Sequence, residues 1–144
     1  MTGGARYLLD TNVVSETRRV RADPGVRAFL SAADATSLFI SVLTLGELQR
    51  GVLAKRRTDP LAADQLGIWV EGIETMFADR ILPVDAATAR RWGELSAGRS
   101  LPVVDTLIAA TALVGDLVLV TRNTRDLEAT GATLIDPWQT ARRR

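Results

Sequence analysis

The chain has 144 residues, of which 47% are apolar and 24% are charged, and its formal net charge at pH 7 is only +1. A chain of this length and apolar content can bury a core of its own, which indicates one folded domain and excludes a disordered chain. Because the sequence has no cysteine and no histidine, it excludes disulfides, thiolate or imidazole metal ligands and a Ser-His-Asp triad.

The first half of the chain alternates short apolar runs with segments of helical spacing. Asp23 is an expected N-cap with Pro24 in the first turn after it, and Thr44 and Glu47 form a Thr-x-x-Glu capping box. The elements predicted there are, in chain order, a strand over 5–9, helices over 12–18 and 23–34, a strand over 37–41, and helices over 44–57 and 60–78.

The second half continues this alternation. Asp85 directly precedes a helix and is best explained as its N-cap. Strands that alternate with helices indicate an α/β fold, with a central mostly parallel sheet of four or five strands flanked by helices. The predicted elements are a strand over 80–85, helices over 86–97 and 103–114, a strand over 116–121, a helical turn within 122–131 and a strand over 132–138.

The sequence carries no evident membrane segment or secretion signal. No apolar run approaches the roughly 18 residues of a membrane-spanning helix, and the N-terminus lacks a basic start followed by a long apolar segment. We therefore expect a cytoplasmic protein with a single domain over residues 1–144. The chain ends in three arginines, and we interpret residues 139–144 as a short basic tail in solvent.

Four acidic residues occupy positions that a parallel sheet would bring together. Asp10 follows the first expected strand, and Glu47 lies near the start of the helix after the second strand. Asp105 begins an otherwise apolar helix, and Asp126 follows the fourth strand, close to Asn123. Strand ends and the N-termini of the following helices share one edge of such a sheet, where ligands bind. We therefore expect the four carboxylates to converge in one cleft.

Each of these acids also has a structural interpretation. Asp10 can cap the helix after it, and Asp126 can cap a turn. Glu47 can complete the capping box with Thr44, and Asp105 can favour a helix N-terminus through the helix dipole. For each residue taken alone, both interpretations stay open.

The set of acids predicts a bound cation. Two carboxylates about 4 Å apart repel by roughly 4 kcal/mol at an effective dielectric near 20, so a cluster is costly unless it is neutralised. Oxygen ligands without histidine or cysteine select the hard ions Mg²⁺ or Mn²⁺. Such an ion activates a bound water and stabilises the oxygens of phosphodiester hydrolysis, so no histidine base is needed.

Four segments stand out along the chain: "LLDTNVVSE" (8–16), "SVLTLGELQRG" (41–51), "PVVDTLIAATA" (102–112) and "VTRNTRDLEATGATLIDPW" (120–138). In this order and at this spacing, they resemble PIN-domain proteins, and more narrowly the VapC-type toxins of bacterial toxin–antitoxin pairs. The resemblance runs from about Tyr7 to Trp138. It implies a PIN-like three-layer sandwich and a Mg²⁺- or Mn²⁺-dependent endoribonuclease, a hydrolase that acts as a toxin.

The resemblance assigns catalytic and metal-binding roles within these segments. The family's first three acids fall on Asp10, Glu47 and Asp105. The fourth position is Asn123, where some members carry an acid, so we expect Asp126 to supply the fourth acid and keep Asn123 as a fourth-ligand candidate. Thr11, Asn12 and Thr121 are expected to orient ligands and waters around the metal. Candidates for a rim that binds RNA phosphates are Arg18, Arg19, Arg21, Arg50 and above all Arg122 and Arg125.

The resemblance also implies partners. They are a tRNA or ribosomal RNA substrate, a VapB-like antitoxin that inserts a peptide into the acidic cleft, and a second copy of the chain in a homodimer. The apolar faces within residues 28–30 and 68–77 are candidates for partner surfaces, although both also suit an ordinary core.

Other functions leave specific marks on a sequence. A catalytically impaired PIN scaffold that only binds RNA or a partner is the main alternative, because Asn123 replaces an acid. A phosphoryl-accepting receiver domain needs a lysine late in the chain, whereas the one lysine is Lys55. A haloacid-dehalogenase-like phosphatase needs a second acid two residues after Asp10, where the sequence has Asn12.

Overall fold

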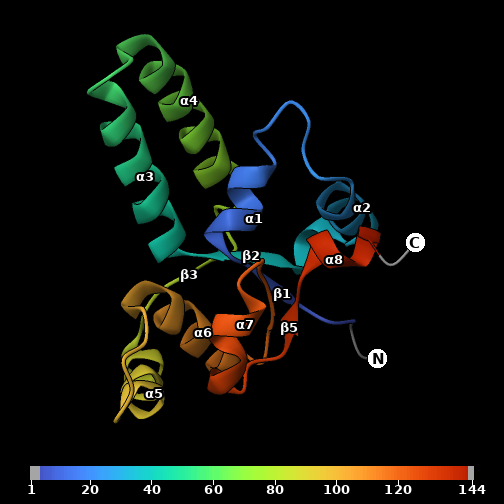
Figure 1. The fold of residues 1–144 in the computed structure, drawn as a ribbon, viewed down its shortest axis with the longest axis vertical. Helices are drawn as coiled ribbons and strands as arrows, with labels where there is room; N and C mark the ends of the chain where they lie inside the picture. The colour runs from blue at the N-terminus through green and yellow to red at the C-terminus, as the bar shows by residue number, and fades with distance from the viewer. Residues whose placement is uncertain (1–3, 143–144) are drawn as a thin grey trace.

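The centre of the molecule is a five-stranded sheet in the order β3-β2-β1-β4-β5 (Figure 1). A computed structural model describes residues 4–142, with side chains described through residue 139. Every neighbouring pair of strands is parallel, which confirms the expected α/β sheet. The strands are β1 (Tyr7–Leu9), β2 (Leu38–Ser41), β3 (Ile81–Leu82), β4 (Val118–Val120) and β5 (Leu134–Ile135).

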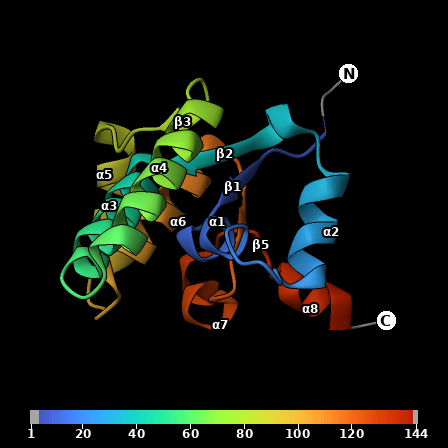
Figure 2. The ribbon, with the colours of Figure 1, turned by 90° about the horizontal axis from the view of Figure 1, so that it is seen from above.

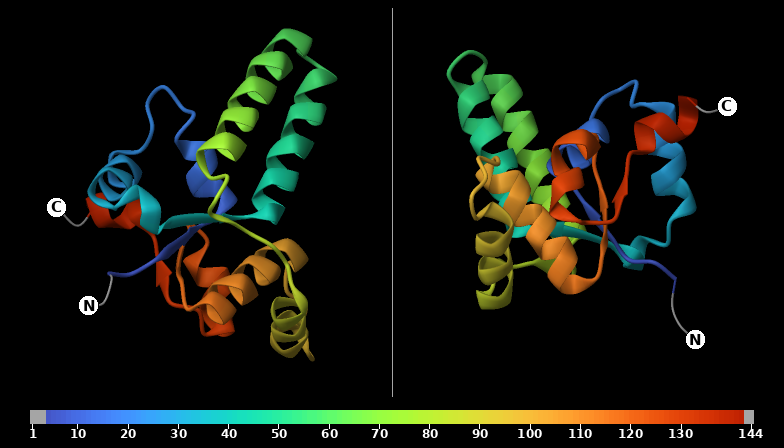
Figure 3. Two further views of the ribbon diagram at one scale, coloured as in Figure 1. Left: turned by 180° about the vertical axis from the view of Figure 1, so that it is seen from behind. Right: turned by 60° about the horizontal axis from the view of Figure 1, so that its bottom comes forward.

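Helices cover both faces of this sheet and make three layers. Figures 1 and 3 show α1 to α4 on one side and α5 to α7 on the other, and Figure 2 shows α8 beside α2. The helices are α1 (Thr11–Glu16), α2 (Pro24–Ala32), α3 (Val42–Arg56), α4 (Pro60–Met76), α5 (Ala86–Ser96), α6 (Val103–Gly115), α7 (Thr124–Leu127) and α8 (Pro137–Arg142), with 3₁₀ turns η1 (Ala35–Ser37) and η2 (Glu128–Thr130). Within residues 4–142, none of these helices has the length and apolar character to cross a membrane.

The central strand β1 serves two separate cores. Successive side chains of a strand point to opposite faces. Leu8 therefore packs with Ile108 of α6, whereas Leu9 packs with Val14 of α1 and Ile73 of α4. Because β1 is buried on both faces, its two leucines are almost completely shielded, and the polar residues that follow them mark the point where the strand reaches the edge of the sheet.

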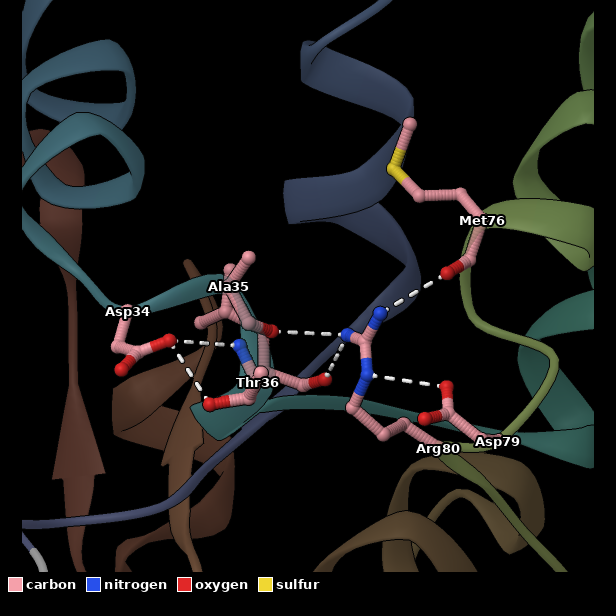
Figure 4. Close-up of polar contacts among 7 residues, drawn as sticks. Asp34, Ala35, Thr36, Met76, Asp79 and Arg80 are labelled. Atoms are coloured by element: carbon pink, nitrogen blue, oxygen red, sulfur yellow. Dashed lines mark hydrogen bonds and ion pairs between the residues drawn. The ribbon is translucent and has the colours of Figure 1, made fainter.

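Arg80 joins the start of β2 to the end of α4 (Figure 4). Its Nη1 donates hydrogen bonds to the carbonyl oxygens of Ala35 and Leu38 at 2.8 and 2.9 Å, and its Nη2 donates to that of Met76 at 2.9 Å. The side chain is only 16% exposed. These bonds fix β2, whose last residue leads directly into α3.

Several predicted caps are confirmed, but the capping box is wrong. Ser41 caps α3 by accepting a hydrogen bond from the Leu43 amide at 3.0 Å, so the helix begins two residues before Thr44. Thr44 is therefore completely buried inside the first turns, and Glu47 does not reach back to cap. Asp23 and Asp85 cap α2 and α5 as predicted.

The last predicted strand is too long. β5 ends at Ile135, and Pro137 begins α8, so Trp138 lies in a helix. Proline suits the first turn of a helix because its missing N–H is not needed there. Asp136 accepts a hydrogen bond from the Trp138 amide at 3.0 Å. Of the basic tail expected over 139–144, residues 143 and 144 lie outside the described part of the chain.

Candidate active site

The candidate site lies at the carboxyl edge of the sheet, where β1 and β4 end side by side. The Asp10 amide donates to the Val120 carbonyl at 2.9 Å, and the Thr121 amide donates to the Ile135 carbonyl at 2.9 Å. These backbone bonds extend the sheet by one residue beyond each strand. They place the side chains of Asp10 and Thr121 next to each other at the edge.

Asp10 is a buried carboxylate whose two oxygens accept hydrogen bonds from different elements. Its side chain is 3% exposed. Oδ1 accepts from the Thr11 amide at 2.8 Å and so caps α1, while Oδ2 accepts from the Thr121 hydroxyl at 2.7 Å. The capping interpretation is therefore correct, but the cap involves only Oδ1. The other oxygen, Oδ2, is bonded to Thr121 at the edge of the sheet.

Thr121 is the hub of the hydrogen bonds on the β4 side. Its hydroxyl accepts from the Asn123 amide at 3.0 Å and lies 3.4 Å from Nδ2 of Asn12. Asn12 in turn accepts from the Arg122 amide at 3.4 Å. The residues expected to orient the site, Asn12 and Thr121, therefore lie in one chain of bonds that ends on Asp10.

Glu47 reaches the same edge from α3. Thr11 Oγ1 donates to Glu47 Oε1 at 2.5 Å and lies 2.9 Å from Thr44 Oγ1. Only one hydroxyl hydrogen is available on Thr11, so Thr44 must donate to Thr11 when Thr11 donates to Glu47. This chain of hydroxyls holds Glu47 against α1. The sequence pattern assigned Thr44 only a capping role. Its contact with Thr11 was not predictable, because the two residues are 33 positions apart.

Asp105 and Asp126 complete the cluster from α6 and α7. Asp105 is half-buried in the first turn of α6, and the Asn123 side chain lies close enough to lower its pKa. Asp126 lies exposed in α7, close enough for its charge to act on Asp105. Asn123 thus supports the third acid, while Asp126 supplies the fourth negative charge. The charges of Glu47 and Asp126 act on Asp105, and those of Glu47 and Asp105 act on Asp10.

The cluster is electrostatically strained. Burial raises the pKa of Asp10 above its usual value of 3.8, and the charges of Asp105 and Glu47 raise it further, against the hydrogen bonds from Thr121 and Thr11. Burial likewise raises the pKa of Asp105, followed by the charges of Glu47 and Asp126, while the bond from Asn123 lowers it. Both carboxylates therefore gain from a cation at this edge.

The donor set fits a hard cation held partly through water. Among the described residues, no three acidic side chains lie close enough to bind one ion together. Mg²⁺ is commonly bound by one or two carboxylates and keeps several waters. Asp10 and Asp105, which carry the raised pKa values, suit direct contact, and Glu47 and Asp126 suit contact through water. The oxygen-only chemistry of these four residues excludes a preference for soft metals.

Arginines without acidic partners surround the cluster. Among the described residues, the guanidinium groups of Arg18, Arg50 and Arg125 make no hydrogen bond or ion pair. Arg122 lies over the ring of Trp138, 4.9 Å from its centre. Trp138 is 4% exposed, so it is a fixed platform for this arginine. Sequence spacing indicated Arg122 but not its platform, because the contact depends on α8 rather than on a strand.

The parallel sheet carries acidic side chains at its carboxyl edge, which is the arrangement that the sequence analysis expected of a PIN domain. The chain belongs to the PIN domain family, whose model matches residues 7–132. The match confirms the predicted family and the three-layer fold.

Several relatives match nearly the whole chain. It is 35% identical to VapC ribonuclease Y4jK of Sinorhizobium fredii over 93% of this chain and 99% of the relative. It is 31% identical to Toxin FitB of Neisseria gonorrhoeae over 91% of this chain and 97% of the relative. The names of these relatives describe a ribonuclease and a toxin.

Solved structures give the same picture. The crystal structure of FitAcB from Neisseria gonorrhoeae superposes with a TM-score of 0.83 at 31% identity, covering 92% of this chain and 98% of that one. The DNA-bound VapBC structure from Salmonella typhimurium superposes with a TM-score of 0.74 at 25% identity, covering 93% and 99%. A further neighbour, described as a toxin-antitoxin complex from Klebsiella pneumoniae, superposes with a TM-score of 0.63 at 25% identity, covering 93% of this chain and 98% of that one.

Proposed function

We propose that this chain is the ribonuclease toxin of a VapBC-type toxin–antitoxin module, a Mg²⁺- or Mn²⁺-dependent endoribonuclease that acts in the cytoplasm. The observation that carries the proposal is the pairwise charge interaction among four carboxylates, which come from the residue after β1 and from α3, α6 and α7. One PIN domain over residues 1–144 supplies all of them. The family membership and the names of the relatives support the same assignment.

Each residue of the cluster has a proposed task. Asp10 and Asp105 hold the metal ion, which when bound supplies an activated water and charge stabilisation for the phosphodiester. Glu47 Oε1 is occupied by Thr11 at 2.5 Å, so Oε2 is the atom that accepts a proton from the attacking water. Asp126 is exposed to solvent and would contribute negative charge beside the ion. Thr121 orients Asp10 by donating to it, and Thr121 and Asn123 favour the ionised forms of Asp10 and Asp105 by lowering their pKa values.

The acidic site repels an anionic substrate, and the positive charge of the arginine rim compensates for this repulsion. Arg122 and Arg125 flank the edge and are proposed to bind phosphates on either side of the scissile bond. Arg122 is held on Trp138, which lowers the conformational entropy that it loses on binding RNA. Substrates of the family type, tRNA or ribosomal RNA, offer the single-stranded loops that such a shallow edge can accept.

The proposed protein partner is a cognate antitoxin. One solved neighbour is described as a toxin-antitoxin complex, and another is a DNA-bound VapBC structure. An apolar groove of about 390 Å³ lies between α1, α2 and α4. Leu30 lines one side, and Ile73, Met76 and Phe77 line the other, so the two faces expected at 28–30 and 68–77 meet in one groove. We propose an apolar antitoxin segment as its occupant and, from the exposed apolar residues of the α3–α4 hairpin, a homodimer.

A catalytically impaired PIN scaffold is the second candidate, and Asn123 is the observation in its favour. Two observations weaken it. The Asn123 side chain favours the ionised form of Asp105 by lowering its pKa, and the charge of Asp126 acts on the same acid. An impaired scaffold would gain nothing from the cost of keeping these carboxylates together.

Mapping of new RNA ends tests the proposal directly. Total bacterial RNA is incubated with the purified protein and Mg²⁺ or Mn²⁺, with Asp10→Asn protein and EDTA as the two controls. Discrete new ends that both controls abolish are the expected result and would identify the substrate. Unchanged RNA from folded protein would favour the impaired scaffold.

A further inference from the structure

A second hollow lies directly beside the acid cluster. It has a volume of about 250 Å³ and opens between α1, α3 and α4. Thr11 and Glu47 form one wall and belong to both the hollow and the cluster. Whatever occupies this hollow therefore lies next to the proposed scissile phosphate. We call it the Trp69 pocket; its lining includes Thr11, Ser15, Arg18, Glu47, Leu66 and Trp69.

The floor of the Trp69 pocket is apolar and aromatic. Leu48 is 7% exposed and belongs to the core, while Leu66 and Trp69 are partly buried and pack against it. The Trp69 indole nitrogen makes no hydrogen bond among the described residues, and it is not one of their buried unpartnered atoms. Its N–H is therefore exposed to solvent and available to an incoming ligand.

The lining of the pocket also carries positive charge, from Arg18 and Arg19. Arg19 pairs with Glu16 at 3.4 Å. Arg18 is exposed and has no hydrogen bond or ion pair among the described residues. Arg18 thus offers an unused guanidinium above an aromatic floor, within reach of ligands that also pass Glu47.

We propose that the Trp69 pocket binds the base of the nucleotide next to the scissile phosphate of a single-stranded RNA, with Arg18 on that nucleotide's phosphate. This assignment rests on the proposed ribonuclease function. The volume corresponds to about eight waters at about 30 Å³ each, which suits one ring system rather than a folded element. Aromatic side chains and arginine are the groups that hold unpaired bases and their phosphates in proteins that bind single strands.

The neighbouring apolar groove helps to decide between RNA and a protein segment. Trp69 also lines that groove, but the rest of its lining, such as Leu30, Ile73 and Met76, is apolar. The Trp69 pocket instead presents hydroxyls, an arginine and the Glu47 carboxylate. An anionic ligand with a flat ring matches the Trp69 pocket, whereas an apolar peptide matches the groove.

Fluorine NMR tests this assignment without any cleavage. The protein, carrying Asp105→Asn to prevent cleavage, is labelled with 5-fluorotryptophan, and its three tryptophans are assigned from single Trp→Phe variants. The probe is a single-stranded RNA of ten nucleotides with mixed sequence. We expect the Trp69 signal to shift on titration and the Trp92 signal, from α5, to stay unchanged.

The Trp138 signal separates two kinds of failure. Trp138 lies under Arg122 of the proposed phosphate rim. A shift at Trp138 without one at Trp69 would overturn the base pocket and leave RNA binding in place. No shift at either residue would overturn both the pocket and the RNA-binding rim.

Two substitutions then measure the contribution of the pocket in the otherwise unmodified protein. Trp69→Leu keeps an apolar floor but removes the stacking surface, and we expect RNA affinity to fall by about fivefold to a hundredfold. Arg18→Gln should weaken binding and lower its salt dependence, whereas Arg57→Gln, at the far end of α3, should change neither. Met76→Ser, in the apolar groove, is the second control and should leave RNA affinity unchanged. Wild-type RNA affinity in both Trp69→Leu and Arg18→Gln would overturn the proposal and leave the pocket to a protein partner.

Discussion

Replacing Thr11 with valine should loosen the acid cluster without touching any carboxylate. Valine has nearly the shape of threonine but cannot bond to Glu47 or Thr44, which lie 2.5 and 2.9 Å from the Thr11 hydroxyl. A hydrogen bond to a charged group contributes about 1.5–3 kcal/mol and a neutral one about 0.5–1.5 kcal/mol. Glu47 is only half-buried and recovers part of its bond from water. We therefore expect a loss of about 1–3 kcal/mol in the free energy of unfolding.

Thermal unfolding and a cleavage assay measure the two consequences separately. For a domain of this size, each kcal/mol shifts Tm by about 2–4 °C, so Thr11→Val should melt about 3–10 °C below the wild type. Because Glu47 loses the donor that holds it, cleavage should fall by about 10- to 100-fold, as for other residues that orient metal-site ligands. Thr11→Ser keeps the hydroxyl and should retain most of both properties.

The result that would refute this reasoning is specific. If Thr11→Val melts within about 1 °C of the wild type and cleaves RNA at the wild-type rate, the hydroxyl chain does not hold Glu47. A loss of Tm with normal cleavage would keep the structural role of Thr11 and remove Glu47 from catalysis.

Three further predictions concern charge. Asp105→Asn should abolish the rise in Tm that Mg²⁺ or Mn²⁺ produces, and an equal rise in the variant would argue against a metal at this acid. In EDTA, the raised pKa values of Asp10 and Asp105 mean that the folded protein binds protons at these two carboxyls more tightly than the unfolded chain does. The stabilisation from these protons is complete below pH about 3.8 and is lost as the pH rises through the folded-state pKa values. The stability of Asp10→Asn/Asp105→Asn relative to the wild type should therefore increase from pH 4 to 7 in denaturant titrations, and a constant difference would contradict the raised values. Arg80→Met should lower the free energy of unfolding by about 2–4 kcal/mol because three carbonyl partners lose their donor, whereas Arg56→Met, which breaks an exposed pair with Asp64, should cost at most about 1 kcal/mol.

The sequence predicted the fold well because its signals are local. Asp23 and Asp85 predicted the starts of two helices, and the apolar run before Asp10 predicted the central strand. The capping box at Thr44 failed because two residues matched a local pattern while Ser41, three residues earlier, was the stronger cap in the folded chain. A pattern within one helix cannot reveal which side chain faces another element.

The candidate site follows the same rule. The proximity of the four acids could be expected from the sequence because a parallel sheet brings strand ends and helix starts to one edge. Their supports were less predictable, since the partners of Thr11 lie 33 and 36 residues away and Thr121 lies 111 residues from Asp10. Hydrogen bonds over such separations depend on register and side-chain rotamers, which spacing in a sequence does not specify.

The position of Asp10 also shows why capping and metal binding need not compete. A cap needs only one carboxylate oxygen, and Thr11 uses Oδ1 alone. Burying the remaining charge at 3% exposure is costly, and the hydrogen bond from Thr121 to Oδ2 offsets only part of that cost, since the pKa is still raised. A fold that needed a cap and nothing more could use serine or asparagine there at no electrostatic cost. The incompletely compensated charge of Asp10 therefore supports the proposed cation at the sheet edge, and the same argument applies to Asp105. The rise in Tm that Mg²⁺ or Mn²⁺ produces, compared between the wild type and Asp10→Asn and Asp105→Asn, is then the measurement that discriminates a working nuclease from a scaffold.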